Sequence, residues 1–113
     1  MEIVTRALDE RLDVIVVSGT ADRAAGSALR DAIDRVLASP KSKVIVDLTD
    51  ATFLDSATLG TIAAAYQRDG RPGRVALVCP PGHVRDMFTM TALDTLLPIH
   101  IALEDARAGL DRD

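Results

Sequence analysis

Apolar and polar residues alternate in short runs over the first twenty positions of the chain. The segments "IVTRAL" and "VIVVSG" are rich in β-branched residues and are separated by the charged segment "DERLD". Short runs of this kind, bounded by a polar turn, predict two antiparallel strands that form a hairpin.

A helical period begins at Ala25. The apolar positions of this segment recur at the spacing of one helix face, at Leu29, Ile33, Val36 and Leu37. Asp22 stands where it can cap the start of the helix, and Pro40 stops the run. The pattern therefore predicts an amphipathic helix after the hairpin.

The middle of the chain alternates strand and helix patterns. The run "VIVDL" at Val44–Leu48 is apolar on both faces apart from Asp47, which is typical of a strand in the centre of a sheet. A helix face then recurs at Leu59, Ile62, Ala63 and Tyr66, and the turn residues of "RDGRPG" end it. "RVALVC" predicts the next buried strand.

The last third of the chain repeats this alternation on a smaller scale. Positions Val84, Met87 and Phe88 predict a short helix after "PPG", "PIHI" predicts a short edge strand, and a terminal helix face recurs at Leu103, Ala106 and Leu110. The predicted order is ββαβαβαβα. Strands joined through helices become parallel neighbours, so we expect a single α/β domain over residues 1–113 with a mixed, mostly parallel sheet, an N-terminal hairpin and helices packed on the sheet.

Composition and charge narrow the function classes. The chain has 113 residues, a formal charge of −4 and 3% aromatic residues, and its basic residues are scattered, so we expect no nucleic-acid partner. Cys79 is the only cysteine, which excludes an internal disulfide. The start "MEIVTRALDE" does not resemble a leader, and the apolar runs are too short to cross a bilayer, so a cytoplasmic protein without direct membrane contact is expected.

The segment "FLDSATLG" places a carboxylate and a hydroxyl between the central strand and the following helix. Asp and Ser are preferred helix N-caps, which is the simplest interpretation of Asp55 and Ser56. In α/β sheets, the loops after the carboxyl ends of the strands commonly carry the functional site, and "DLTDATFLDS" is predicted to be the loop after the central strand.

The segment "VIVDLTDATFLDSATLGTIAAAY" resembles the signature of STAS domains, in particular the bacterial anti-sigma factor antagonists. "VVSGTAD" and "FTMTALDTLLPIHIALEDA" are similar to two further stretches of that family, so the resemblance covers almost the whole chain. It implies a phosphorylation-switched binding protein and not an enzyme.

The resemblance also implies specific partners and residues. A cognate anti-sigma factor serine kinase would be bound while Ser56 is unphosphorylated, which frees a sigma factor, and would be released once Ser56 carries a phosphate. A serine phosphatase is a further candidate partner. The implied contact residues are Asp22, Asp55, Ser56, Ala57 and Thr58.

This chain departs from the family pattern beside the phosphorylation site. Ala57 and Thr58 follow the serine where the family usually has Ser or Thr and then Gly, and Gly19-Thr20-Ala21-Asp22 stands where it usually has Gly-Glu-Leu-Asp. Thr58 is a second candidate acceptor, although its place within the first helical turn favours Ser56. The alternative function is a STAS docking module of a transport or lipid-trafficking complex without a phosphorylation cycle.

A serine hydrolase would need a histidine base within reach of Ser56. No Gly-x-Ser-x-Gly elbow surrounds Ser56, His83 is predicted to start a helix, and His100 lies in the predicted edge strand. We therefore expect no catalytic residues.

The carboxylates of Asp47, Asp50 and Asp55 form a candidate magnesium site of the kind found in phospho-aspartate proteins. Such a protein would also need an acidic pair after its first strand and a lysine late in the chain, whereas "VVSGT" has no acidic pair and the only lysines are Lys41 and Lys43. Cys79 and the histidines lack zinc-ligand spacing. No metal or cofactor is expected.

Overall fold

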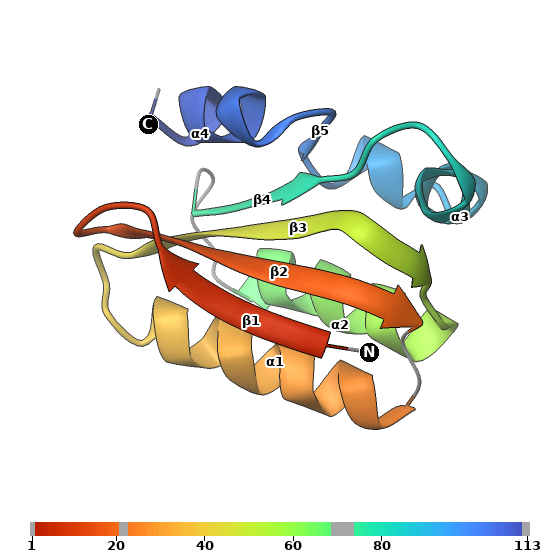
Figure 1. The fold of residues 1–113 in the computed structure, drawn as a ribbon, viewed down its shortest axis with the longest axis horizontal. Coiled ribbons are helices and arrows are strands. Elements are labelled where there is room, and N and C mark those ends of the chain that lie inside the picture. The colour runs from red at the N-terminus through yellow and green to blue at the C-terminus, as the bar shows by residue number, and fades with distance from the viewer. Residues whose placement is uncertain (1, 21–22, 69–73, 112–113) are drawn as a thin grey trace.

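A five-stranded sheet with the order β1-β2-β3-β4-β5 forms the centre of the molecule (Figure 1). The computed structural model describes residues 2–20, 23–68 and 74–111 of the chain. The strands are β1 (Glu2–Ala7), β2 (Leu12–Thr20), β3 (Lys43–Phe53), β4 (Val75–Val78) and β5 (Ile99–His100). The helices are α1 (Arg23–Leu37), α2 (Ser56–Arg68), α3 (His83–Met90) and α4 (Leu103–Asp111), with a 3-10 turn η1 at Leu93–Thr95.

The strand directions confirm the predicted fold. β1 and β2 form an antiparallel hairpin, and β2, β3, β4 and β5 pair in parallel. β3 is the central strand and β5 lies at the edge, as the hydrophobic pattern predicts. The described elements follow the predicted order ββαβαβαβα, and η1 is the one addition among them.

Alternation along the strands divides the apolar residues between two faces of the sheet. α1 and α2 lie side by side on one face, and α4 lies on the other (Figure 1). Ile15 and Val17 of β2 belong to the cluster under α1 and α2, which also includes Phe88 of α3. Leu12 and Val14 belong to a smaller cluster that α4 covers. The period of two in β2 thus supplies both clusters.

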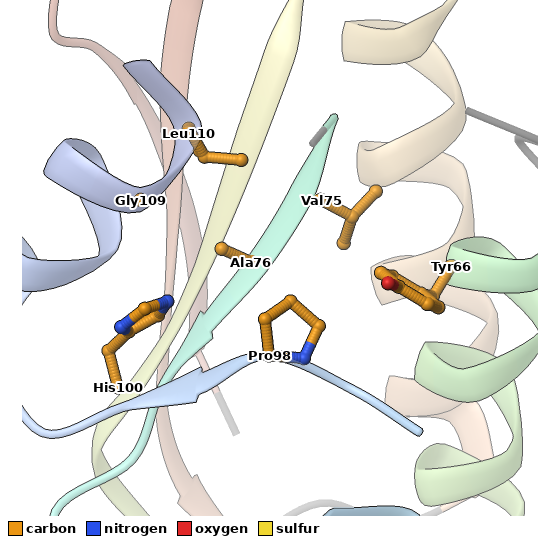
Figure 2. Close-up of a pocket in the computed structure, with 7 residues that line it drawn as sticks. All are labelled: Tyr66, Val75, Ala76, Pro98, His100, Gly109 and Leu110. Carbon is orange, nitrogen blue, oxygen red and sulfur yellow. The ribbon is translucent and has the colours of Figure 1, made fainter. Parts of the chain in front are cut away.

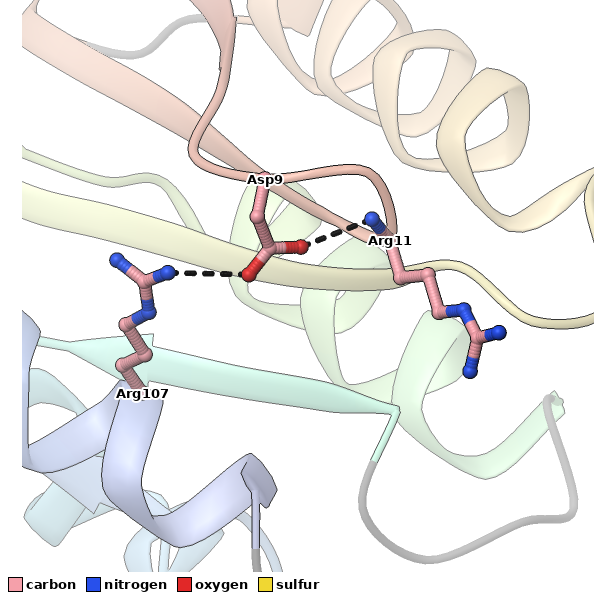
Figure 3. Close-up of polar contacts among 3 residues, drawn as sticks. All are labelled: Asp9, Arg11 and Arg107. Carbon is pink, nitrogen blue, oxygen red and sulfur yellow. Dashed lines mark hydrogen bonds and ion pairs between the residues drawn. The ribbon is translucent and has the colours of Figure 1, made fainter.

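Two polar contacts hold α4 against the sheet. The Nζ of Lys43, at the start of β3, donates to the carbonyl oxygen of Leu110 at 2.5 Å, near the end of α4. Arg107 donates to Asp9 in the β1–β2 turn at 3.0 Å, and the other Asp9 oxygen accepts the backbone N–H of Arg11 at 2.8 Å (Figure 3). The Arg11 N–H and, less strongly, Arg107 lower the pKa of the Asp9 carboxyl.

Candidate functional site at the start of α2

β3 is longer than the apolar run Val44–Leu48 predicts. Pairing with β2 continues through Asp50 and Ala51 to Phe53. The prediction of a loop over "DLTDATFLDS" is therefore wrong for most of that segment. Only Leu54 and Asp55 separate β3 from α2. Two threonines and a phenylalanine favour the extended backbone here, and continued pairing with β2 overrides the turn tendency of the aspartates.

Two register shifts bend the end of β3 toward α2. β2 advances from Val16 to Thr20 while β3 advances from Asp47 to Phe53, so β3 carries two more residues than β2 over this interval. Extra residues of this kind bulge and twist a strand, and bulges commonly redirect side chains next to functional sites. The bend in β3 is visible in Figure 1.

Asp55 is the N-cap of α2. Its Oδ1 accepts the backbone N–H of Thr58 at 2.8 Å, and its carbonyl oxygen accepts the N–H of Leu59 at 3.1 Å. α2 begins at Ser56, so the predicted helix boundary is confirmed, while the cap is Asp55 and Ser56 is the first helical residue. This arrangement satisfies one of the N–H groups that every helix start leaves open.

Ser56 and Ala57 are exposed on the first turn of α2. The first N–H groups of a helix have no partner within the helix, and the helix dipole favours an anion near them. The Ser56 hydroxyl is therefore accessible to a modifying enzyme, and a phosphate attached there would meet a locally positive backbone.

Thr58 does not share this surface. Its side chain is 0% exposed, and its Oγ1 has no hydrogen-bond partner among the described residues. A Cβ built on Gly26 of α1 would lie 3.4 Å from that oxygen, which shows how closely the two helices approach. The expectation that the Thr58 side chain belongs to the contact surface is corrected, because the inner face of α2 encloses it.

Asp22, the contact residue expected on the neighbouring loop, lies outside the described residues. Thr20 is the last described residue before it. The Oγ1 atoms of Thr20 and Thr52 are 3.0 Å apart and hydrogen-bonded, so the ends of β2 and β3 are joined by side chains as well as by backbone pairing. The predicted turn "RDGRPG" also falls largely outside the described residues, at 69–73.

The histidines have other neighbours than Ser56. His83 begins α3, and its ring stacks on Phe53 with the ring centroids 6.2 Å apart. His100 is half-buried in β5, and a Cβ on Gly109 of α4 would lie 3.2 Å from its ring. No hydrogen bond between either histidine and Ser56 is present in the described structure, so a Ser–His pair is not assembled.

The candidate magnesium ligands are not brought together either. Within the described ranges, no group of three or more His, Cys, Asp or Glu side chains could hold a metal ion. Oδ1 of Asp47 instead accepts the N–H of Thr49 at 2.9 Å and its hydroxyl at 2.6 Å. The Cys79 thiol is buried, and desolvation raises its pKa, which disfavours the reactive thiolate.

Sequence reasoning missed a cleft beside this site. A cavity of about 270 Å³ lies between the end of β3 and the segment that leads into α3; it is lined by Leu48, Thr49, Ala51, Thr52, Cys79, Pro80, Pro81, Gly82, His83 and Val84. The "PPG" segment predicts only a turn, and the cleft depends on how far β3 extends. A second pocket, of about 220 Å³, lies where β4, β5, α2 and α4 meet, and its described lining residues include none of the predicted site residues (Figure 2).

None of the helices in the described part of the chain has the length and apolar character needed to span a bilayer.

Comparison with known proteins identifies relatives over nearly the whole chain. The sequence model of a family described as "Mlab, STAS domain" matches residues 4–98. The anti-sigma-F factor antagonist RsfB of Mycobacterium tuberculosis is 27% identical over 107 residues, which cover 95% of this chain and 88% of that protein. A crystal structure of an anti-sigma factor antagonist from Mycobacterium paratuberculosis has a TM-score of 0.87 at 28% identity and covers 99% of this chain and 94% of its own. The unphosphorylated form of SpoIIAA, at 18% identity, shares the fold with a TM-score of 0.73 over 98% of both chains.

Proposed function

Because the chain belongs to the STAS domain family, we propose that it is an anti-sigma factor antagonist switched by phosphorylation of Ser56. In its unphosphorylated form it binds a cognate anti-sigma factor serine kinase and so frees a sigma factor. The phosphorylated form releases the kinase. The relatives named as anti-sigma factor antagonists support this class of partner.

The exposed Ser56 at the first position of α2 is the observation that carries the proposal. Asp55 orders this position because its carboxylate fixes the first turn of the helix. Asp22, Asp55, Ser56 and Ala57 are the proposed contacts. Thr58 supports this surface from within, since its side chain is buried behind it.

The switch is electrostatic in this proposal. A phosphoryl group adds about −1.5 to −2 charges at neutral pH, next to the carboxylate of Asp55. In the free protein, the open N–H groups and the dipole of α2 accommodate that charge, so the helix stays folded. In the complex, the phosphate would have to be buried against a surface shaped for a neutral hydroxyl, and kinase affinity falls.

A kinase assay tests the proposal directly. The kinase recovered with the protein from its native host is incubated with ATP and the protein, and phosphopeptides are mapped. We expect phosphate on Ser56, none on Thr58, and none on the Ser56→Ala variant. Phosphate mainly on Thr58 would show that the switch is misplaced, and recovery of a permease or lipid-transport ATPase with Ser56 unmodified would favour a docking module.

Binding and folding are then measured on the same variants. Ser56→Ala is expected to bind the kinase persistently, and Ser56→Asp to bind weakly with a wild-type melting curve. A Ser56→Asp variant that loses affinity only together with its fold would contradict the electrostatic mechanism. The purified protein alone should show no hydrolase activity, because no base partners Ser56 in the described structure.

A further inference from the structure

β3 extends beyond its neighbour β4. Pairing between these strands covers only Val44–Asp47 of β3 and stops at Val78 of β4, whereas pairing with β2 continues to Phe53. Two prolines follow soon after β4, at Pro80 and Pro81. Proline has no N–H to donate to a ladder, so β4 cannot continue beside β3. The last part of β3 is left with one edge that no described strand occupies.

The cleft of about 270 Å³ lies along this edge. Its lining combines buried apolar side chains from both walls, at Leu48 and Val84, with the exposed threonines Thr49 and Thr52 of β3. The ring of His83, also in the lining, stacks on Phe53, which is 41% exposed. The cleft therefore offers an apolar floor and an aromatic rim beside a strand edge that no described strand pairs with.

We propose that an extended segment of the anti-sigma factor kinase enters this cleft and pairs with the open edge of β3 as an added strand. The inference rests on the proposed function and extends the contact surface from Ser56 to β3. An open strand edge presents backbone donors and acceptors in a row, and pockets for alternate side chains give such pairing its specificity. An apolar side chain of the segment would pack against Leu48, Ala51 and Val84.

Position and charge favour this occupant over a phosphate-bearing small molecule. No lysine or arginine is among the described residues that line the cleft, and Asp50 is exposed on the same part of β3. A segment with a basic residue next to its apolar one complements that carboxylate. Phe53 ends β3 only three positions before Ser56, so one partner can contact the cleft and the phosphorylation site together.

Amide hydrogen exchange on the unmodified wild-type protein tests the pairing without a variant. The protein is measured alone and with the full-length kinase that phosphorylates it. We expect exchange of those amides of 50–53 that face away from β2 to slow by about tenfold or more in the complex, because added backbone hydrogen bonds protect amides. Unchanged exchange at these positions, with protection confined to the start of α2, would overturn the inference and leave the proposed function standing.

A matched pair of substitutions provides the second test. Thr49→Trp places a large side chain in the cleft, whereas Thr5→Trp makes the same change at an exposed threonine of β1, away from the cleft. We expect Thr49→Trp to weaken kinase binding by about tenfold and Thr5→Trp by less than about twofold. Melting curves verify that both variants fold.

The outcomes separate the two proposals. Wild-type affinity in a folded Thr49→Trp variant would overturn the added strand, while phosphorylation of Ser56 would still support the switch. If the wild-type protein neither binds the kinase nor accepts phosphate from it, both proposals fail. Equal weakening by both tryptophan variants would also count against the cleft.

Discussion

The hydroxyl of Thr58 is enclosed between α2 and α1 without a hydrogen-bond partner in the described structure. A buried hydroxyl that gives up water and gains no partner destabilises the folded state. Gly26 contributes to this packing, because a glycine on α1 lets the two helices approach closely at Thr58. The first turn of α2 is thus fixed from below by packing and at its start by the Asp55 cap.

Thr58→Val should stabilise the protein. Valine has nearly the same shape and removes the unpaired hydroxyl, so we expect the free energy of unfolding to rise by about 1 kcal/mol. The melting temperature should rise by roughly 4 °C. Thr61→Val is the matched control on the same helix, because the Thr61 hydroxyl donates to Ala57 and its loss should bring no gain. A Thr58→Val variant less stable than wild type would show that the hydroxyl has a partner.

At this scale, local patterns predict the helix boundary at Ser56 but not which side chains meet across the fold. A cap depends on residues three positions apart, which a sequence displays directly. The burial of Thr58 depends on Gly26, and the stacking of Phe53 depends on His83, both far away in sequence. The expected role of Asp22 remains a prediction.

At the scale of single elements, α2 depends on its cap. Asp55→Ala should lower the free energy of unfolding by about 1 kcal/mol, because the N–H of Thr58 loses its acceptor. Asp55→Asn should retain most of the stability, since asparagine is an equally good N-cap. Chemical denaturation of the three proteins measures both effects, and equal losses in both variants would assign the effect to charge.

The limits of β3 show where periodicity ceases to be informative. The apolar positions in Val44–Leu48 predict the strand, and the polar residues after them predict a loop. Pairing with β2 extends β3 to Phe53, beyond the end of the apolar run. The sequence pattern does not predict η1 either, because a turn of three residues is too short to show a period.

α4 is the helix that covers the second cluster of the sheet. Ala106 is 0% exposed against this cluster, whereas Ala108 is exposed on the same helix. Ala106→Asp should lower the free energy of unfolding by at least about 3 kcal/mol, because it buries an unpaired charge. Ala108→Asp should change it by less than about 0.5 kcal/mol. Thermal melts of the pair measure the difference, and similar melts would show that α4 is not packed as described.

For the molecule as a whole, Asp9 links the β1–β2 turn to α4 through Arg107. The Arg11 N–H and Arg107 lower the pKa of Asp9 below its ordinary value of 3.8. A carboxyl with a depressed folded-state pKa stabilises the fold above its unfolded-state pKa, and this contribution is lost as pH falls through the folded-state pKa. The stabilising effect of the Asp9 carboxylate should therefore disappear in acid.

Asp9→Asn should accordingly lower the melting temperature at pH 7 and make no difference in strong acid. The difference in melting temperature between wild type and Asp9→Asn should shrink to nothing as pH falls below about 4. Thermal melts from pH 7 to strong acid measure it, with Glu10→Gln, an exposed neighbour outside this ion pair, as the control. A melting-temperature difference that persists unchanged in acid would mean that the Asp9 side chain acts by shape and not by charge.

The contact between Lys43 and Leu110 places the end of α4 and Ser56 at opposite ends of the molecule. Leu110 is bound at the start of β3, and Ser56 follows the end of the same strand. At about 3.3 Å of rise per residue, the length of β3 separates Leu110 from Ser56 by roughly 30 Å. The longest extent of the molecule is 31 Å. A fluorophore attached near the end of α4 would therefore leave the surface around Ser56 free for the kinase. Energy transfer to a second dye on the kinase would then report binding and release in real time.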